Sequence, residues 1–354
     1  MQMNTYLPVA DAATAAEVLG IPEEQLIKLD ANENPYGPSP LVREALAQPL
    51  PYHLYPDAMQ RRARAALAEY TGIPAEQIVL GNGSDELIDL LLLALVKPGD
   101  DVLVPVPTFG VYLSRPPLFG AAVQSVARNE DFDLDIPKIL SAIRPTTRLI
   151  FLASPNNPTG NPVTRHQLEQ LLRTGIFVVA DEAYYEFAGQ TFAPLLQEYD
   201  NLGILRTFSK WAGLAGLRIG YGLFPRWLAD RLWAIKQPFN VSVPALRAVE
   251  AALADRAIQF QTVIQLRLER GRLYRKLRTI PYLKPYPSHG NFILCRVTVG
   301  DAHAVHAWLA QHGILVRKYD DPLLRDCLRI SVGLPEHTDQ IIAVLQSYQP
   351  EANG

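Results

Sequence analysis

Lys210 is the residue of this sequence whose surroundings point most directly to chemistry. It lies in the run RTFSKWAGLAGLRIGYG, residues 206–222, among apolar and glycine residues. A lysine ammonium is rarely buried without a partner, because removing an unpaired charge from water is costly. At a ligand-filled edge of a sheet, a lysine can act as an amine nucleophile that is activated by desolvation and nearby charge. The alternative is a surface lysine beside a flexible glycine loop.

Two further segments are suited to binding an anion. Arg218 follows Lys210 by eight residues, and its planar guanidinium can hold a phosphate through two oxygens. The segment GNGSDE, residues 81–86, combines a glycine turn with Ser84 and Asp85, both good N-cap residues, before an apolar helix. The free N–H groups at such a helix start suit a phosphate, although an ordinary capped helix is the alternative. The spacing matches neither the dinucleotide fingerprint nor the P-loop.

Asn157 and Asp181 are the next candidates. Asn157 lies in the turn SPNNPTG, residues 154–160, where its amide can donate to a phenolate or carbonyl oxygen or simply belong to a turn. Asp181 ends the apolar run FVVA, where a carboxylate is costly unless it caps a helix or faces a cation. A protonated ring nitrogen is such a cation, and Tyr184 would then reach the same ligand.

Short apolar runs predict the strands that must position these residues. They cover residues 78–80, 101–106, 122–127, 149–153, 176–180, 201–208 and 220–224. Continuous apolar runs indicate strands that are covered on both faces, and hence an α/β fold with a mostly parallel sheet between helices. The motifs GNGSDE, PTFG, SPNNPTG, DEAYY and SK each follow a predicted strand. Ligands bind at that edge of a parallel sheet, so the five motifs predict one site.

The pattern changes around PFNVSVPA, residues 238–245, where two prolines precede a run of helix formers from Leu246 to about Leu277. Short strand patterns and a helix at 301–313 follow, which indicates a smaller α+β unit. We therefore expect an N-terminal arm over 1–40 that packs with the small domain. A large domain that carries the predicted site would cover 41–240, and the small domain 241–354.

The composition argues against several classes of protein. The 354 residues are 48% hydrophobic, and 33 basic against 36 acidic residues give a net charge of −3. This balance provides no basic surface for nucleic acid or anionic membranes. The two cysteines, Cys295 and Cys327, have neither metal-ligand spacing nor a disulfide pattern, and residues 87–96 are too short to span a bilayer. We expect a soluble cytoplasmic protein, and no metal site at His303, His306 and His312.

The ordered set of motifs resembles the fold type I pyridoxal-phosphate aminotransferases, and among them the histidinol-phosphate aminotransferase family. The resemblance extends over most of the chain. It rests on DANENPYGPSP, YPD, GNGSDE, PTFG, SPNNPTG, ADEAYYEF, RTFSKWAGLAGLRIGYG and CLRISVG.

The resemblance implies roles for the residues around a pyridoxal 5'-phosphate cofactor. Lys210 would bind the cofactor aldehyde covalently and later move a proton, and Asp181 would keep the pyridine nitrogen protonated. Asn157 and Tyr184 would bind the ring oxygen. Phe109 would stack on the ring without the hydroxyl of the tyrosine that many relatives have there. The cofactor phosphate would be bound by Ser84, Asp85, Thr207, Ser209 and Arg218, and by Tyr55 across the interface of a homodimer with shared active sites.

The resemblance also implies a reaction. Arg329 and Arg317 would bind the substrate phosphate or carboxylate, and Asn34 would line the entrance. The expected activity is transamination of L-histidinol phosphate with 2-oxoglutarate, which yields glutamate, in histidine biosynthesis. Transamination of aromatic or other amino acids, a lyase such as a threonine-phosphate decarboxylase, and a non-catalytic cofactor-binding protein remain alternatives.

Overall fold

The core of the molecule is a seven-stranded sheet, seen in a computed structural model that describes residues 9–350. Its order is β2-β8-β7-β6-β5-β3-β4, and only β8 runs against the other strands. The strands are β2 (Ile78–Asn82), β3 (Asp101–Val106), β4 (Ala122–Ala127), β5 (Thr147–Ala153), β6 (Phe177–Asp181), β7 (Leu202–Thr207) and β8 (Ile219–Leu223). All seven predicted strands are present, and the predicted α/β fold class is confirmed.

Both faces of this sheet are buried, as the continuous apolar runs predicted. In β6, Phe177 and Val179 pack into one apolar cluster, whereas Val178 and Ala180 pack into the other. Helices α4 (Gly83–Leu95) and α9 (Arg226–Ile235) cover the first face, and α3 (Arg61–Thr71) and α7 (Arg165–Leu172) lie on the second. Successive side chains of a strand point to opposite faces, so each strand supplies both layers.

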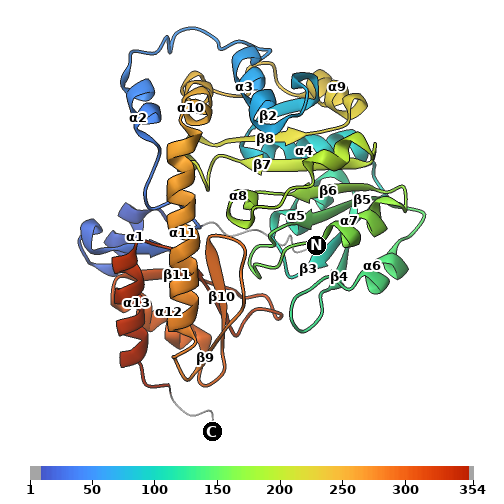
Figure 1. Cartoon of the computed structure of the whole chain (residues 1–354). Helices are drawn as coiled ribbons and strands as arrows, with labels where there is room; N and C mark the ends of the chain where they lie inside the picture. The colour runs from blue at the N-terminus through green and yellow to red at the C-terminus, as the bar shows by residue number, and fades with distance from the viewer. Residues whose placement is uncertain (1–8, 351–354) are drawn as a thin grey trace.

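A second sheet of five strands forms the lower part of the molecule in Figure 1. Its order is β1-β11-β12-β10-β9, and its strands are β1 (Ile27–Leu29), β9 (Leu283–Pro285), β10 (Phe292–Val297), β11 (Ile314–Lys318) and β12 (Cys327–Ser331). Helices α12 (Ala302–Gln311) and α13 (Pro335–Ser347) accompany it. Strand β1 pairs in parallel with β11, so a strand near the N-terminus completes a sheet built from C-terminal strands.

The run of helix formers that begins at Leu246 is two helices rather than one. They are α10 (Val243–Ala254) and α11 (Arg256–Leu277), separated by Asp255, whose backbone at φ −101° and ψ 17° leaves the helical region. Aspartate is a weak helix former, because its side chain competes for nearby backbone groups. Arg256 donates to the Leu253 carbonyl at 3.0 Å, which satisfies one free acceptor at the end of α10.

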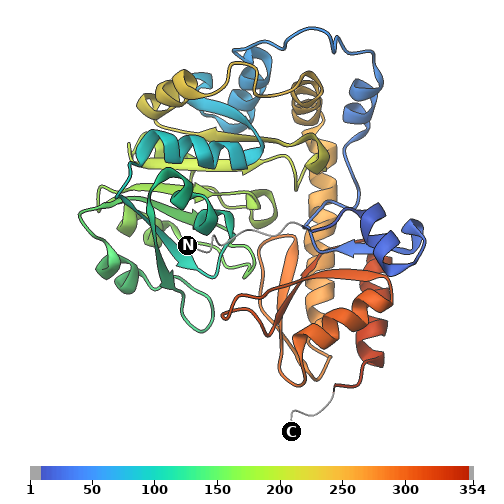
Figure 2. The same ribbon diagram turned by 180° about the vertical axis from the view of Figure 1, so that it is seen from behind.

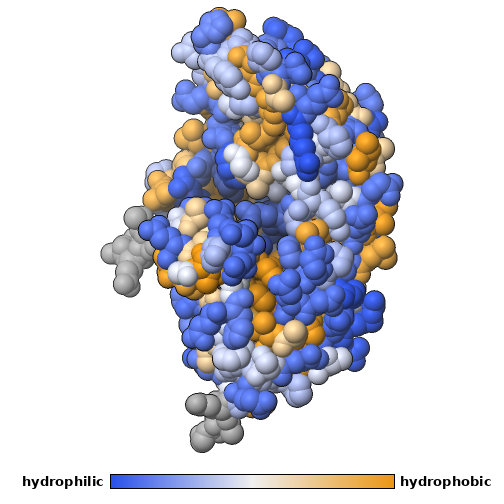
Figure 3. Space-filling view, turned by 90° about the vertical axis from the view of Figure 1, so that its left-hand side faces the viewer, coloured by the Kyte–Doolittle hydropathy of each residue, from blue (hydrophilic) through white to orange (hydrophobic). Residues whose placement is uncertain are grey.

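Helix α11 passes beside both sheets and connects them, as the two opposite views show (Figures 1 and 2). The side of the molecule that carries α1 (Ala12–Leu19) and α2 (Pro40–Ala47) is largely hydrophilic, with apolar residues in separate patches (Figure 3). None of the helices within residues 9–350 has both the length and the apolar character that a membrane-spanning segment requires.

Candidate active site

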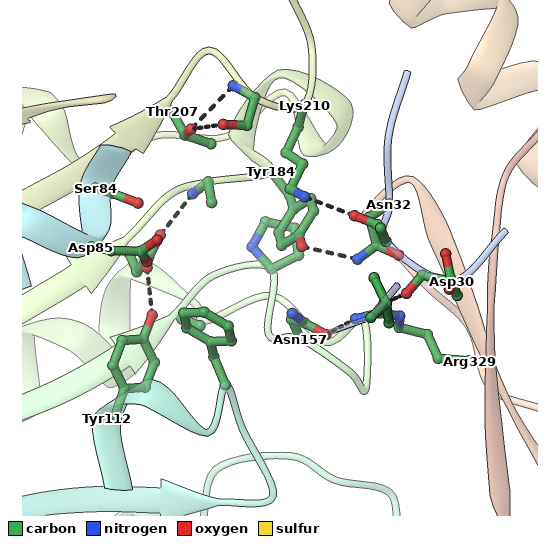
Figure 4. Close-up of a pocket in the computed structure, with 18 of the residues that line it drawn as sticks. Asp30, Asn32, Ser84, Asp85, Tyr112, Asn157, Tyr184, Thr207, Lys210 and Arg329 are labelled. Carbon is green, nitrogen blue, oxygen red and sulfur yellow. Dashed lines mark hydrogen bonds between the residues drawn. The ribbon is translucent and has the colours of Figure 1, made fainter. Parts of the chain in front are cut away.

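A cavity of about 270 Å³ lies where the carboxyl ends of the parallel strands meet the second sheet. Eleven of the residues predicted for the site line it: Ser84, Asp85, Phe109, Asn157, Asp181, Tyr184, Thr207, Ser209, Lys210, Arg218 and Arg329. These residues come from separate strand ends and loops and surround one space (Figure 4). The prediction that the polar motifs converge at one edge of the sheet is therefore confirmed.

Lys210 enters this cavity from the loop that follows β7. Its Nζ donates to the Ala31 carbonyl at 2.9 Å, and no carboxylate of the described residues forms an ion pair with it. Desolvation, together with the positive charge of Arg329, lowers the pKa of Lys210 to about 8. A neutral amine is therefore accessible near physiological pH, and a neutral amine is the nucleophilic form.

Asp181 ends β6 and also lines the cavity. Its Oδ2 accepts a short hydrogen bond from the Tyr112 hydroxyl, and its Oδ1 accepts from the Ala183 N–H at 2.9 Å. No lysine or arginine within residues 9–350 forms an ion pair with it. Desolvation raises the pKa of Asp181 to about 6, although the Tyr112 hydrogen bond opposes this rise. A buried carboxylate without a cation is suited to a ligand that brings one.

The end of the cavity near α4 can bind an anion. Arg218 donates to Asp85 Oδ2 at 3.0 Å and to Ser209 Oγ at 3.3 Å, and Ser209 Oγ lies 3.0 Å from Thr207 Oγ1. Helix α4 begins at Gly83, so Ser84 and Asp85 lie within its first turn and not at the N-cap as the sequence suggested. The N-cap is Asn82, whose side chain makes no capping hydrogen bond with the helix. The N–H groups of the first turn thus remain available to a ligand.

A third group of side chains links the cavity to the second sheet. Arg329 of β12 donates to Asn157 Oδ1 at 2.7 Å and to the Asp30 carbonyl. Its Nε is buried and has no hydrogen-bond partner among the described residues. Arg317 of β11 is the direct cross-strand neighbour of Arg329, although it does not line the cavity. Opposite residues of an antiparallel pair share one face of the sheet, so both arginines project from the same face.

Two further predicted residues lie away from the cavity. Asn34 is buried, and its amide donates to the Trp211 carbonyl at 2.9 Å and accepts from the Tyr36 N–H at 3.0 Å. Tyr55 is 80% exposed and stacks on Phe239, with 4.4 Å between ring centroids. Within one chain, neither of them lines the cavity.

Comparisons with known proteins agree with this geometry. The family model of aminotransferase class I and II matches residues 24–345. The chain belongs to the aminotransferase class I and II family. The resemblance drawn from the sequence motifs is thereby confirmed.

Two relatives with the same name are similar to this aminotransferase over nearly their full lengths. Histidinol-phosphate aminotransferase of Dehalococcoides mccartyi is 49% identical to it over 322 residues, which are 91% of this chain and 90% of the relative. The protein of that name from Roseiflexus castenholzii is 47% identical over 353 residues, which are 97% and 95% of the two chains.

A solved structure has the same fold. Histidinol-phosphate aminotransferase from Sinorhizobium meliloti, in complex with pyridoxal-5'-phosphate, superimposes with a TM-score of 0.86 at 28% identity and covers 96% of each chain.

Tyr112, Asn32 and Ala31 are among the residues of the aminotransferase cavity that the sequence motifs did not single out. Tyr112 follows Phe109 by three residues in the short helix α5 (Val111–Ser114), and that helical spacing was the available signal. Asn32 lies in the motif DANENPYG, from which Asn34 was selected instead. Ala31 contributes its main-chain carbonyl, which no side-chain pattern can indicate.

Proposed function

We propose that this aminotransferase uses pyridoxal 5'-phosphate to exchange the amino group of L-histidinol phosphate with 2-oxoglutarate, a step of histidine biosynthesis. The observation that carries the proposal is a single cavity. It contains an amine of lowered pKa, a buried carboxylate that forms no ion pair within residues 9–350, and a helix start suited to an anion. The narrower substrate assignment rests on relatives of that name at 47% and 49% identity.

The anion end of the cavity fits the cofactor phosphate. Gly83 has φ +78°, and a Cβ at this position would approach Arg218 Nη2 to 2.8 Å. Any larger residue would therefore fill the space between the first turn of α4 and the guanidinium. Main-chain N–H groups of Ser84 and Asp85, the hydroxyls of Thr207 and Ser209, and Arg218 would hold the phosphate there.

The rest of the cavity fits the pyridine ring. Asp181 would face the ring nitrogen and supply the negative charge that a protonated nitrogen requires. Phe109 lies at the cavity wall, where it would cover one face of the ring, and Asn157 and Tyr184 would bind the ring oxygen. When bound, the cofactor supplies an electron sink that stabilises negative charge at the substrate α-carbon.

The residues of the chain would perform the proton transfer and orient the substrate. Lys210 would react as a neutral amine because of its lowered pKa. After release, its Nζ would take the proton from the substrate α-carbon and deliver it to the cofactor. Arg329 and Arg317, on the same face of the second sheet, would bind the substrate phosphate or the carboxylate of glutamate.

The exposure of Tyr55 supports a homodimer with shared active sites. Tyr55 does not line the cavity of its own chain, so it would reach the cofactor phosphate of a partner subunit. A second cavity of about 240 Å³ beside Tyr55 is lined by residues of α3 and α10 and offers a surface on which a second copy would pack. Tyr52, Leu54 and Phe239 nearby are also exposed, and burying their apolar surface would favour association.

The pairing of β1 with β11 supports the three-part organisation of an arm over 1–40, a large domain over 41–240 and a small domain over 241–354. We also infer that the reaction takes place in the cytoplasm. The two cysteines, Cys295 and Cys327, are buried free thiols, which fits a reducing compartment.

The test is a single-turnover absorption titration of the cofactor-loaded protein with L-histidinol phosphate, glutamate and phenylalanine. We expect saturable conversion to the pyridoxamine form, at a much lower concentration of histidinol phosphate than of phenylalanine. A preference for phenylalanine would reassign the substrate, and release of carbon dioxide from threonine phosphate would indicate the lyase.

The matched control is Lys210→Ala, which should remain folded and lose conversion by at least about 10³-fold. Full activity of that variant would contradict the role of the lysine, whatever the substrate is.

A further inference from the structure

Asn32 occupies an unusual backbone conformation at the rim of the cavity. It follows β1 closely, its φ is +55°, and the residue is 1% exposed. Residues other than glycine rarely adopt this left-handed region, although asparagine does so more readily than most. The conformation is therefore maintained by the contacts that surround the residue.

Four hydrogen bonds hold Asn32 in place. Its N–H donates to Ser331 Oγ at 2.9 Å, and the Ser331 hydroxyl donates to Asn32 Oδ1 at 3.0 Å. The Asn291 amide donates to the Asn32 carbonyl at 3.0 Å. The remaining bond runs from Asn32 Nδ2 to the Tyr184 hydroxyl oxygen at 2.9 Å (Figure 4). The side-chain amide of Asn32 thus connects Ser331 of the second sheet to Tyr184 at the end of the seven-stranded sheet, and Asn291 holds its main chain.

These contacts define the direction of the hydrogen bond to Tyr184. With Oδ1 turned toward Ser331, each polar atom of the Asn32 amide and of the Ser331 hydroxyl is used. In the reversed orientation, Ser331 Oγ would face two N–H donors, and its own proton would have no acceptor in these contacts. Asn32 is therefore the donor and Tyr184 the acceptor. A hydroxyl has one proton, so the proton of Tyr184 must point to a different acceptor.

We propose that Asn32, held by Ser331 and Asn291, is a positioning residue that makes Tyr184 donate its hydroxyl proton toward the ring oxygen of the cofactor. The inference rests on the proposed function only for the presence of that oxygen. Tyr184 lines the same cavity as Asn157 and Lys210, so a ring oxygen bound in that cavity would offer its hydroxyl proton an acceptor.

The two main-chain carbonyls that precede Asn32 contact two further residues of the site. The Ala31 carbonyl accepts from Lys210 Nζ at 2.9 Å, and the Asp30 carbonyl accepts from Arg329. Residues 30, 31 and 32 thus contact Arg329, the Lys210 amine and Tyr184 in succession. Anchoring Asn32 fixes the placement of both carbonyls as well.

The test is a pH titration of the visible absorption band of the cofactor-loaded protein, without substrate. Asn32→Asp keeps the shape of the side chain but replaces the donor by an acceptor, so Tyr184 would give its proton to the new carboxylate. Losing a donor destabilises the anionic ring oxygen. The pKa of the bound cofactor, which the pH titration of the band reports, should therefore rise by about one unit. Asn32→Gly tolerates the positive φ and only removes the amide, so it should cause a smaller rise.

The Tyr184→Phe background separates positioning from charge. If Asn32 acts through Tyr184, Asn32→Asp should add no further shift to Tyr184→Phe. An equal shift in both backgrounds would show a direct effect of the introduced charge and would overturn the proposal. An unchanged titration of Asn32→Asp would overturn it too.

Ser331→Ala provides a second variant if substitution of Asn32 prevents folding. It removes the hydroxyl donor that orients the Asn32 amide. The pKa obtained from the titration should therefore rise as in Asn32→Asp, but by a smaller amount. An unchanged titration of a folded Ser331→Ala protein would contradict the proposed orientation. If wild-type protein forms the band but does not convert histidinol phosphate, only the substrate assignment fails. If it forms no band with the cofactor, both proposals fail.

Discussion

Asp181 and Glu182 follow one another at the end of β6, yet their side chains have opposite surroundings. Asp181 lines the cavity, and among the described residues its carboxylate accepts from the Tyr112 hydroxyl and the Ala183 N–H. Glu182 lies on the other side of the sheet, where Arg206 donates to its Oε2 from Nε at 3.0 Å and from Nη2 at 2.9 Å. The Thr191 hydroxyl and the Phe192 N–H complete the bonds to Glu182.

The difference separates a structural carboxylate from a functional one. The side chains of Glu182 and Arg206 are 1% and 3% exposed, so their charges compensate each other within the chain. Asp181 is also buried, at 5% exposed, but has no such cation within residues 9–350. In the proposed function, the ring nitrogen of the cofactor provides it. Glu182 should therefore contribute mainly to the stability of the fold, and Asp181 mainly to catalysis.

The largest expected effect is on stability. Glu182→Gln leaves the Arg206 guanidinium buried without a counter-charge, which should lower the free energy of unfolding by about 3–5 kcal/mol. Denaturant titration of the loaded protein measures this loss, and the turnover of the protein that remains folded should change little.

Glu186→Gln is the matched control. Burial raises the pKa of Glu186 well above its ordinary value, so this substitution removes little charge. Equal destabilisation by the two substitutions would contradict the view that the Arg206 pair explains the loss.

The next effect is on catalysis. Asp181→Asn should lower kcat by on the order of 10²–10³-fold, because an amide cannot hold the ring nitrogen in its charged form. Steady-state kinetics with L-histidinol phosphate measures the loss, while circular dichroism should show an unchanged fold. Nearly full kcat in Asp181→Asn would contradict the catalytic role of Asp181.

A smaller effect concerns pH and the cofactor-free protein. The pKa of Asp181 is raised to about 6, so the folded state binds this proton more tightly than the unfolded chain does. The resulting stability is fully present below about pH 4 and is lost as the pH rises through about 6. Cofactor-free Asp181→Asn should therefore be more stable than wild type at pH 7, by on the order of 2–3 kcal/mol, and equal to it near pH 4. Thermal unfolding at both pH values checks this, and a constant difference would contradict it.

The smallest effect concerns Thr191, which donates to Glu182 and accepts from Arg206 Nη2 at 2.6 Å. Its Oγ1 also accepts from the Ala193 N–H at 3.0 Å. Thr191→Val removes these hydrogen bonds but leaves the ion pair, and we expect a loss of about 1–2 kcal/mol. Chemical denaturation measures it. A loss as large as that of Glu182→Gln would show that the hydrogen bonds, and not the charge pair, dominate this region.

The sequence predicted the part of the site that depends on strand ends. Lys210, Asp181 and Asn157 each follow an apolar strand, and parallel strands bring such positions to one edge of a sheet. Most strands of the large sheet were predictable because they are continuous apolar runs, whereas the edge strand β4 also contains Gln124 and Ser125.

The remainder depends on contacts between segments far apart in the chain. Asn32 forms hydrogen bonds with Tyr184, which is 152 residues away in the sequence, and with Ser331, which is 299 residues away. No local sequence pattern predicts such contacts. Strand β1 was missed because its three residues acquire strand structure only by pairing with β11. The break at Asp255 was missed because helix formers lie on both sides of it.

The most direct test of the contrast between Asp181 and Glu182 is the ¹⁵N NMR shift of ring-labelled pyridoxal phosphate bound to the wild-type protein, Asp181→Asn and Glu182→Gln. We predict a protonated ring nitrogen in the wild type and in folded Glu182→Gln at neutral pH, and an unprotonated nitrogen in Asp181→Asn. An unprotonated nitrogen in the wild type, or the same shift in all three proteins, would contradict the assignment of Asp181 as the carboxylate that keeps the ring nitrogen protonated.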